Sequence, residues 1–143
     1  HLSLRRQRQM CIRDSHTIED VSIALGEAFK NAIGKRENIE RYASSENLVM
    51  DETISNVSID MASRPFLKMK TSKLREYVGD FPTEMFEHFF ISFINTLGFT
   101  CHIETKGTNS HHIIEATFKS FTRALSNALK KNDSAVASTK GTL

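Results

Sequence analysis

Residues 99–115, FTCHIETKGTNSHHIIE, contain a strand pattern, a turn and the start of a helix in direct succession. Residues 99–104 alternate strictly between apolar and polar side chains, which is the period of a half-buried β-strand. Residues 106–109, Lys-Gly-Thr-Asn, are typical of a turn, and Ser110 is a candidate N-cap for the helix that follows. This succession predicts a strand whose chain turns back as a helix.

Two helices are predicted around that strand. The later helix follows Ser110, and the earlier one is opened by Pro82 and ended by Gly98. Both have apolar residues at steps of three and four, the spacing of one helix face. The stripe of the earlier helix is Phe86, Phe89, Phe90, Phe93 and Leu97, and that of the later helix is Ile114, Phe118, Phe121, Leu125 and Ala128 or Leu129.

Two further strands are predicted ahead of these helices. Residues 57–61 alternate between apolar and polar side chains, and residues 66–71 follow a short break at Ser63-Arg64-Pro65. Residues 55–130 therefore predict strand, strand, helix, strand, helix. This is an α+β unit with both helices packed on one face of the sheet.

The N-terminal part of the chain predicts one more helix. It starts at Asp14 or Ser15, ends at Gly34, and has the apolar stripe Ile18, Val21, Leu25, Ala28 or Phe29, and Ala32. Residues 35–52 are polar and predict a connection. Residues 1–13 are basic without periodicity, so we expect a disordered or foreign leader ahead of a single domain, 14–143.

Composition limits the class of protein. The chain has 143 residues, a net charge of +2, 39% hydrophobic residues and two cysteines. A net charge this small produces no overall positive field that would attract nucleic acid. Arg5, Arg6 and Arg8 lack interleaved aromatic residues, so they are weak support for nucleic-acid binding. No apolar run is long enough to cross a membrane. Cys11 and Cys101 form no disulfide framework, so we expect a reducing, cytoplasmic location and neither nucleic acid nor membrane as a partner.

The His111-His112-Ile113-Ile114-Glu115 stretch is a candidate metal site. On a helix, His111 and Glu115 are four residues apart and His112 and Glu115 are three apart, so the three side chains are expected to converge at the first turn. Imidazole and carboxylate ligands together favour first-row transition metals. The alternative is a solvated polar helix face.

An internal repeat supports the metal interpretation. A shift of 96 residues places Ser15-His16-Thr17-Ile18-Glu19 over the His111–Glu115 stretch and pairs Ala28 with Ala124 and Asn31 with Asn127. Two helices with His and Glu at the same place in their first turns indicate a duplicated fold with a pair of metal sites. Few residues precede the first copy, so we expect its half of the fold to be truncated.

These motifs are similar to those of the imidazoleglycerol-phosphate dehydratases. The resemblance rests on Ser15–Asp20, Asn109–Lys119, Ile23-Ala24-Leu25-Gly26, Met50-Asp51-Glu52, Asp60 with Ser63-Arg64-Pro65, Glu87-His88-Phe89-Phe90 and Ser138-Thr139-Lys140-Gly141. It implies a duplicated α+β half and a shell of twenty-four subunits with metal sites at subunit contacts. It also implies a lyase of histidine biosynthesis that dehydrates imidazole glycerol phosphate to imidazole acetol phosphate through an imidazolate held between metal ions.

The resemblance also implies roles for individual residues. The metal ligands would be His16, Glu19, His88, His111, His112 and Glu115, with Glu19 and Glu115 as candidate catalytic residues. The cofactor would be Mn²⁺, two ions per subunit in an intact chain. The phosphate group would be bound by Arg41, Arg64, Lys119, Ser138 and Lys140, since fixed cations and hydroxyl donors suit a phosphate monoester.

The chain departs from the family at several points. Ser15 stands where the family has the first histidine of a pair, and residues 1–14 lack the family's upstream Leu-Asp-His-Met motif. The alternative function is therefore an inactive metal-binding oligomerisation fragment, and a third is a metal hydrolase with Glu115 as general base. His88 also fits a plain helix-flank residue, and Arg41, Arg64 and Lys119 also fit ordinary surface cations. For His102 we expect no ligand role.

Overall fold

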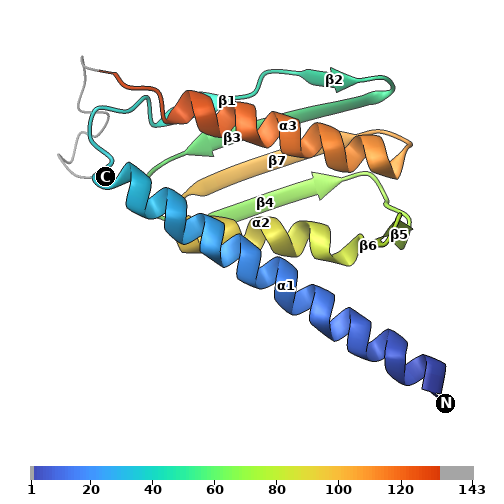
Figure 1. The fold of residues 1–143 in the computed structure, drawn as a ribbon. Coiled ribbons are helices and arrows are strands. Elements are labelled where there is room, and N and C mark those ends of the chain that lie inside the picture. Colours follow the sequence, from blue (N-terminus) through green and yellow to red (C-terminus); the bar gives the residue numbers. More distant parts are fainter. Residues whose placement is uncertain (1, 133–143) are drawn as a thin grey trace.

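The computed structural model describes residues 2–132, and the side chains of residues 16–132. One sheet carries helices on one side, and no described helix covers its other side within residues 2–132 (Figure 1). In chain order the elements are α1 (Leu2–Ile33), β1 (Tyr42–Ser44), β2 (Leu48–Met50), β3 (Thr53–Asp60), β4 (Phe66–Thr71), β5 (Tyr77–Val78), β6 (Phe81–Pro82), α2 (Glu84–Leu97), β7 (Thr100–Lys106) and α3 (Ser110–Ala128).

The sheet has the strand order β1-β3-β7-β4, and β2 also pairs with β3. β3 and β7 are antiparallel with Val57 opposite Ile103, whereas β4 runs parallel to β7 with Met69 opposite Ile103. A parallel pair needs a crossover, and α2 provides it between β4 and β7. The predicted order of strands and helices in residues 55–130 is confirmed, as is the packing of both helices on one face.

The core between the sheet and the helices is rich in phenylalanine. Strand residues Val57, Ile59, Cys101 and Ile103 point inward, as their alternation predicts. They meet the buried faces of α2 and α3, which contribute Phe86, Phe90, Phe93, Ile94, Leu97, Phe121, Ala124, Leu125 and Ala128. The ring of Phe90 lies 5.0 Å from those of Phe118 and Phe121, so the two helices are joined by aromatic contacts.

A buried chain of hydroxyl groups fixes α3 against the sheet. Thr117 donates to the carbonyl of Ile113 at 2.7 Å, and its hydroxyl lies 2.8 Å from that of Thr105. The Thr105 hydroxyl in turn lies 2.7 Å from that of Ser55 on β3. Each hydroxyl has only one proton, so Ser55 donates to Thr105 and Thr105 to Thr117. These hydrogen bonds fix the position of the first turns of α3 relative to β3 and β7.

Helix α1 differs from its prediction in two ways. It begins at Leu2, so residues 2–13 belong to the helix, and the prediction of a start at Asp14 or Ser15 after a disordered leader is wrong. Its predicted stripe packs only in part, since Val21 and Leu25 are 49% and 41% exposed. Phe29 is 37% exposed, but its ring centroid lies 5.6 Å from that of Phe93 on α2. Among the described residues no helix, this long one included, is apolar enough to cross a membrane.

Small residues of α1 also pack on α2, beside the contact of Phe29 with Phe93. Gly26 is buried at this contact, and Ser22, four residues before it, is buried as well. A Cβ atom at Gly26 would lie 2.7 Å from the Cβ of Thr96, so only glycine allows the two helices to approach this closely. The hydrophobic periodicity therefore identified the helix and the contact of Phe29 correctly, but it did not predict that Ser22 and Gly26 are buried.

Short strands were missed in two places. Residues 35–52, predicted as a connection, contain β1 and β2, each of three residues. The segment before α2 contains the β5–β6 pair, which places Pro82 in a strand and not at the helix start. Strands of two or three residues are too short to show a period of two. The turn from β2 to β3 includes Asp51, whose φ of 49° lies in the left-handed region.

The Arg36 side chain links the C-terminal end of α2 to the residue that follows β3. Its guanidinium donates to the carbonyls of Met61 at 2.8 Å, Gly98 at 2.5 Å and Leu97. Arg36→Ala would leave these carbonyls without their donor, so we expect it to lower the free energy of unfolding by about 1–3 kcal/mol. Urea unfolding measures the change, and Lys35→Ala, an exposed neighbour, is the control. Equal losses in the two variants would contradict this role.

Candidate metal centre

The turn between β7 and α3 presents the two adjacent histidines at the start of α3. Asn109 is the N-cap residue, and its side-chain oxygen accepts a hydrogen bond from the backbone N–H of His111 at 2.9 Å. The prediction of Ser110 as N-cap is therefore wrong. Its hydroxyl instead accepts a hydrogen bond from the backbone N–H of Arg75 at 3.0 Å, which anchors the preceding loop to this turn.

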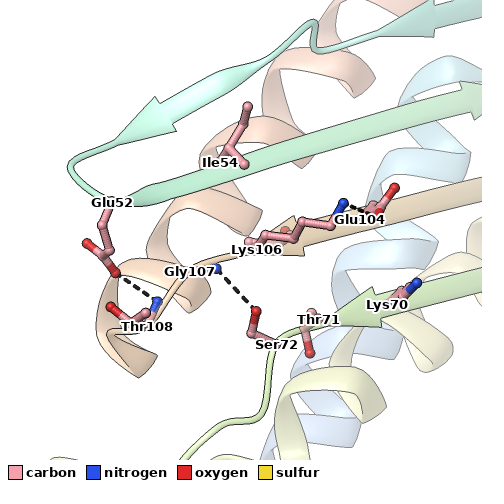
Figure 2. A pocket seen from close by; sticks show the side chains of 10 residues that line it. Glu52, Ile54, Lys70, Thr71, Ser72, Glu104, Lys106, Gly107 and Thr108 are labelled. Carbon is pink, nitrogen blue, oxygen red and sulfur yellow. Dashed lines mark hydrogen bonds and ion pairs between the residues drawn. The ribbon is translucent and has the colours of Figure 1, made fainter.

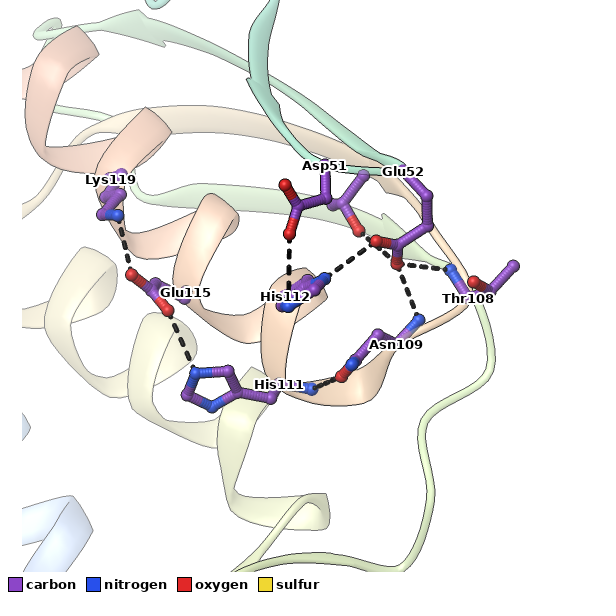
Figure 3. Close-up of polar contacts among 9 residues, drawn as sticks. Asp51, Glu52, Thr108, Asn109, His111, His112, Glu115 and Lys119 are labelled. Atoms are coloured by element: carbon purple, nitrogen blue, oxygen red, sulfur yellow. Dashed lines mark hydrogen bonds and ion pairs between the residues drawn. The ribbon is translucent and has the colours of Figure 1, made fainter.

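His111 and Glu115 form one half of the candidate centre (Figure 3). The Nε2 atom of His111 lies 3.1 Å from Oε2 of Glu115, and Nζ of Lys119 lies 2.7 Å from Oε1 of the same carboxylate. The hydrogen bond from Lys119 lowers the pKa of Glu115, which is thus a carboxylate at neutral pH. Two donors at right angles around an ion, each about 2.1 Å away, lie about 3.0 Å apart. The His111–Glu115 spacing therefore fits a shared cation.

His112 faces away from this pair. Its Nδ1 lies 2.8 Å from Oε2 of Glu52, and its Nε2 lies 3.7 Å from Oδ2 of Asp51. Within residues 16–132 no three His, Cys, Asp or Glu side chains come together as a group that could hold a metal ion. The expectation that His111, His112 and Glu115 converge on one point is therefore wrong. The structure gives two half-sites, one at His111 and Glu115 and the other at His112.

Glu52 is a site residue that the sequence reasoning did not assign. Its Oε1 accepts hydrogen bonds from the backbone N–H groups of Thr108 and Asn109, at 3.1 and 2.8 Å, and from the Thr53 hydroxyl at 3.0 Å. The hydrogen bond with His112, followed by that from Asn109, holds the pKa of Glu52 far below its usual range. The Met50-Asp51-Glu52 motif contributed to the resemblance, but nothing near it in sequence indicated a contact with His112.

The same contact changes the titration of His112. The hydrogen bond with Glu52 raises the pKa of His112 above that of a free histidine, and the charge of Asp51 adds to the effect. A raised pKa means that the imidazolium form persists to higher pH. A cation that binds His112 must therefore compete with a proton that is held more firmly than usual.

The other three predicted ligands lie on α1 and α2. His16 and Glu19 are in the middle of α1, not in its first turn, and His88 is an exposed residue of α2. The structure brings none of them into a group of three possible ligands with the α3 residues, as far as residues 16–132 are concerned. Their ligand roles stay predictions.

The predicted phosphate-binding residues are scattered. Arg41 is buried and its Nε lies 2.8 Å from Oδ1 of Asp60, so its charge is neutralised within the fold. Arg64 is exposed in the turn between β3 and β4. Lys119 is exposed on α3 beside Glu115. Ser138 and Lys140 lie outside the described residues.

A hollow of about 610 Å³ lies at the edge of the sheet where β4 and β7 end (Figure 2). It is lined by Glu52, Ile54, Lys70, Thr71, Ser72, Glu104, Thr105, Lys106, Gly107 and Thr108. None of the residues predicted to bind metal or phosphate is among these lining residues. Through Glu52, however, the wall of the hollow is connected to His112.

Comparison with known proteins places the chain in one family. The family model described as Imidazoleglycerol-phosphate dehydratase matches residues 1–125, which includes the segment expected to lie outside the match. The histidine biosynthesis bifunctional protein HisB of Legionella pneumophila (strain Philadelphia 1) is 43% identical over 142 residues, and that of Stenotrophomonas maltophilia (strain K279a) is 39% identical. The chain spans 40% and 39% of the length of these relatives, and 99% of the chain is matched.

Solved structures agree with the sequence match. The imidazoleglycerol-phosphate dehydratase of Staphylococcus aureus is 38% identical, with a TM-score of 0.79 over 83% of this chain and 70% of that one. That of Pyrococcus furiosus is 31% identical, with a TM-score of 0.77 over 91% of this chain and 72% of that one. The predicted α+β fold is thus the fold of these enzymes. Motifs, fold and overall sequence lead to the same conclusion: the chain belongs to the imidazoleglycerol-phosphate dehydratase family.

Proposed function

We propose that the chain takes part in the dehydration of imidazole glycerol phosphate to imidazole acetol phosphate, a step of histidine biosynthesis. Membership of the family, with His111 and Glu115 held 3.1 Å apart at the start of α3, is the observation that carries the proposal. The chain covers about two fifths of the bifunctional relatives it matches. The proposal therefore concerns this reaction alone.

The cofactor proposed is Mn²⁺, with two ions per intact subunit. His111 with Glu115 would contribute to one ion and His112 to the other. Because each half-site offers too few ligands within residues 16–132, the remaining donors would come from His16, Glu19 and His88 of neighbouring copies in a homo-oligomer, twenty-four subunits in the family. When bound, such an ion supplies positive charge that stabilises an anionic form of the substrate.

The reaction removes a carbon-bound proton and a hydroxyl group from the substrate, which leave together as water, and the resulting enol rearranges to the ketone. Glu19 and Glu115 are the proposed catalytic residues, because a carboxylate can accept the proton. The low pKa of Glu115 beside Lys119 keeps it ionised for ligation or proton transfer. Arg64, Lys119, Ser138 and Lys140 would hold the phosphate. Arg41 would have to exchange Asp60 for phosphate, or else stabilise the fold only.

An inactive metal-binding oligomerisation fragment is the second candidate. The observation in its favour is Ser15, a neutral hydroxyl next to His16 where the resemblance implies a second imidazole. In that case the chain would bind metal and assemble through His111, His112 and Glu115 but would not turn over substrate.

The test is formation of imidazole acetol phosphate from imidazole glycerol phosphate with added Mn²⁺. It compares the natural chain, a Ser15→His variant and a Glu115→Ala variant. Turnover by either of the first two, lost in Glu115→Ala and on chelation, is the result expected. Mn²⁺ binding by the natural chain and by the Ser15→His variant, without turnover in either, would favour the fragment. Absence of both binding and turnover in the natural chain would contradict both proposals.

The affinity for Mn²⁺ is expected to fall as the pH decreases. Ligand histidines must lose their proton to bind, and an ordinary histidine has a pKa of about 6.5. Since Glu52 raises the pKa of His112, the loss of affinity should begin above that pH. Isothermal titration calorimetry between pH 5 and 8.5 measures it. An affinity that does not change over this range would contradict histidine ligation.

A further inference from the structure

We propose that Glu52 is a positioning residue that fixes the tautomer of His112, placing the proton on Nδ1 and leaving Nε2 as the lone-pair donor. The inference rests on the proposed function in taking His112 as a metal ligand. It adds a role for a residue of the β2–β3 turn, which lies 60 residues away in sequence from the histidine it orients.

The Glu52 carboxylate is held in place by bonds that do not involve the histidine. Its Oε1 accepts from the backbone N–H groups of Thr108 and Asn109 and from the hydroxyl of Thr53. These donors come from both ends of the site, the start of β3 and the turn before α3 (Figure 3). These three donors bind one oxygen, and the other oxygen, Oε2, is directed at His112.

The 2.8 Å contact between Oε2 and Nδ1 of His112 determines where the proton lies. An ionised carboxylate only accepts hydrogen bonds, so Nδ1 must be the donor. In the neutral ring the other nitrogen, Nε2, then has a free lone pair. Its distance of 3.7 Å from Asp51 Oδ2 is too long for a hydrogen bond, so this nitrogen is available to a cation. Carboxylates that hold a ligating histidine through its second nitrogen are a general means of orienting metal ligands.

Glu52→Gln reverses this arrangement without changing the shape of the side chain. The three donors around Oε1 require an acceptor there, so the amide oxygen should take that position. The amide NH₂ then faces His112 and must donate to Nδ1, which moves the ring proton to Nε2. The matched control is Glu104→Gln, since Glu104 is an exposed carboxylate of β7 whose ion pair, 2.9 Å long, is with Lys106 and not with a histidine.

Two measurements on the full chain test the proposal. In the first, long-range ¹H–¹⁵N spectra of the metal-free protein at about pH 8.5 report the tautomer of His112. We expect Nδ1–H in the natural chain and in Glu104→Gln, and Nε2–H in Glu52→Gln. In the second, Mn²⁺ titration should show an affinity reduced by about 10- to 100-fold in Glu52→Gln and unchanged in Glu104→Gln.

An Nε2–H tautomer in the natural chain would overturn the proposal, and this result needs no variant that has to fold. Unchanged tautomer and affinity in a folded Glu52→Gln protein would overturn it as well. The spectra separate this inference from the function proposed above. If the natural chain binds no Mn²⁺, the metal-dependent function fails, while the tautomer still decides whether Glu52 orients His112.

Discussion

Phe90→Ala is expected to remove about 3–5 kcal/mol from the free energy of unfolding. Phe90 is fully buried, and its ring centroid lies 5.0–5.5 Å from those of Phe86, Phe89, Phe118 and Phe121. Truncation would remove these contacts and leave a cavity where α2, α3 and the sheet meet. Native domains are stabilised by only about 5–15 kcal/mol in total, so much of this chain's stability would be lost.

Chemical denaturation followed by circular dichroism measures this effect. Ile91→Ala is the matched control, because Ile91 is the next residue of α2 and is 38% exposed. We expect its cost to be below about 1 kcal/mol. If the two variants lost similar amounts of stability, the phenylalanine-rich interface would not be the core that the structure indicates.

His112→Ala is expected to reduce the affinity for Mn²⁺ at least about 100-fold, and to abolish assembly that depends on the metal. The side chain would be a direct ligand, and no other imidazole of α3 is oriented as it is, since the ring of His111 lies 6.0 Å away and is directed at Glu115. Calorimetric titration and analytical ultracentrifugation with and without Mn²⁺ measure the two effects.

His102→Ala is the control for this variant. His102 is exposed on β7, where its ring lies 5.9 Å from that of Phe66, on the face of the sheet away from α3. We expect its Mn²⁺ affinity to stay within about twofold of the natural chain. Equal losses of Mn²⁺ affinity in the two variants would mean that His102, on the sheet face away from α3, had been wrongly excluded as a ligand.

The order of the longer elements in residues 53–128 could be predicted because each of them shows its period, whereas β5 and β6, of two residues each, could not. Apolar and polar side chains alternate over residues 57–61 and 99–104, which cover much of β3 and β7. The helices α2 and α3 repeat their apolar positions over several turns. The packing of α1 could not be predicted in this way. Besides Phe29, its contact with α2 uses Gly26, and a small residue that allows close approach gives no hydrophobic signal.

Most residues of the candidate site could be predicted from the sequence, but the way their side chains are arranged could not. Residues one apart on a helix do not face each other, so His111 and His112 had to diverge, whereas residues four apart, His111 and Glu115, meet as predicted. The partner of His112 could not be found from spacing, because Glu52 reaches it only through the pairing of β2 with β3 and the return of the chain to α3. Contacts between residues so far apart in sequence depend on how the strands pair and how the chain connects them.

The most direct test of the metal centre is anomalous diffraction at the manganese edge from crystals of this chain grown with Mn²⁺. We predict a peak about 2 Å from both Nε2 of His111 and Oε2 of Glu115, while Lys119 keeps its ion pair with Oε1 of the same carboxylate. A second peak is predicted beside Nε2 of His112, while its Nδ1 keeps the contact with Glu52. Manganese bound only at other residues, or no manganese in crystals of the folded protein, would contradict it.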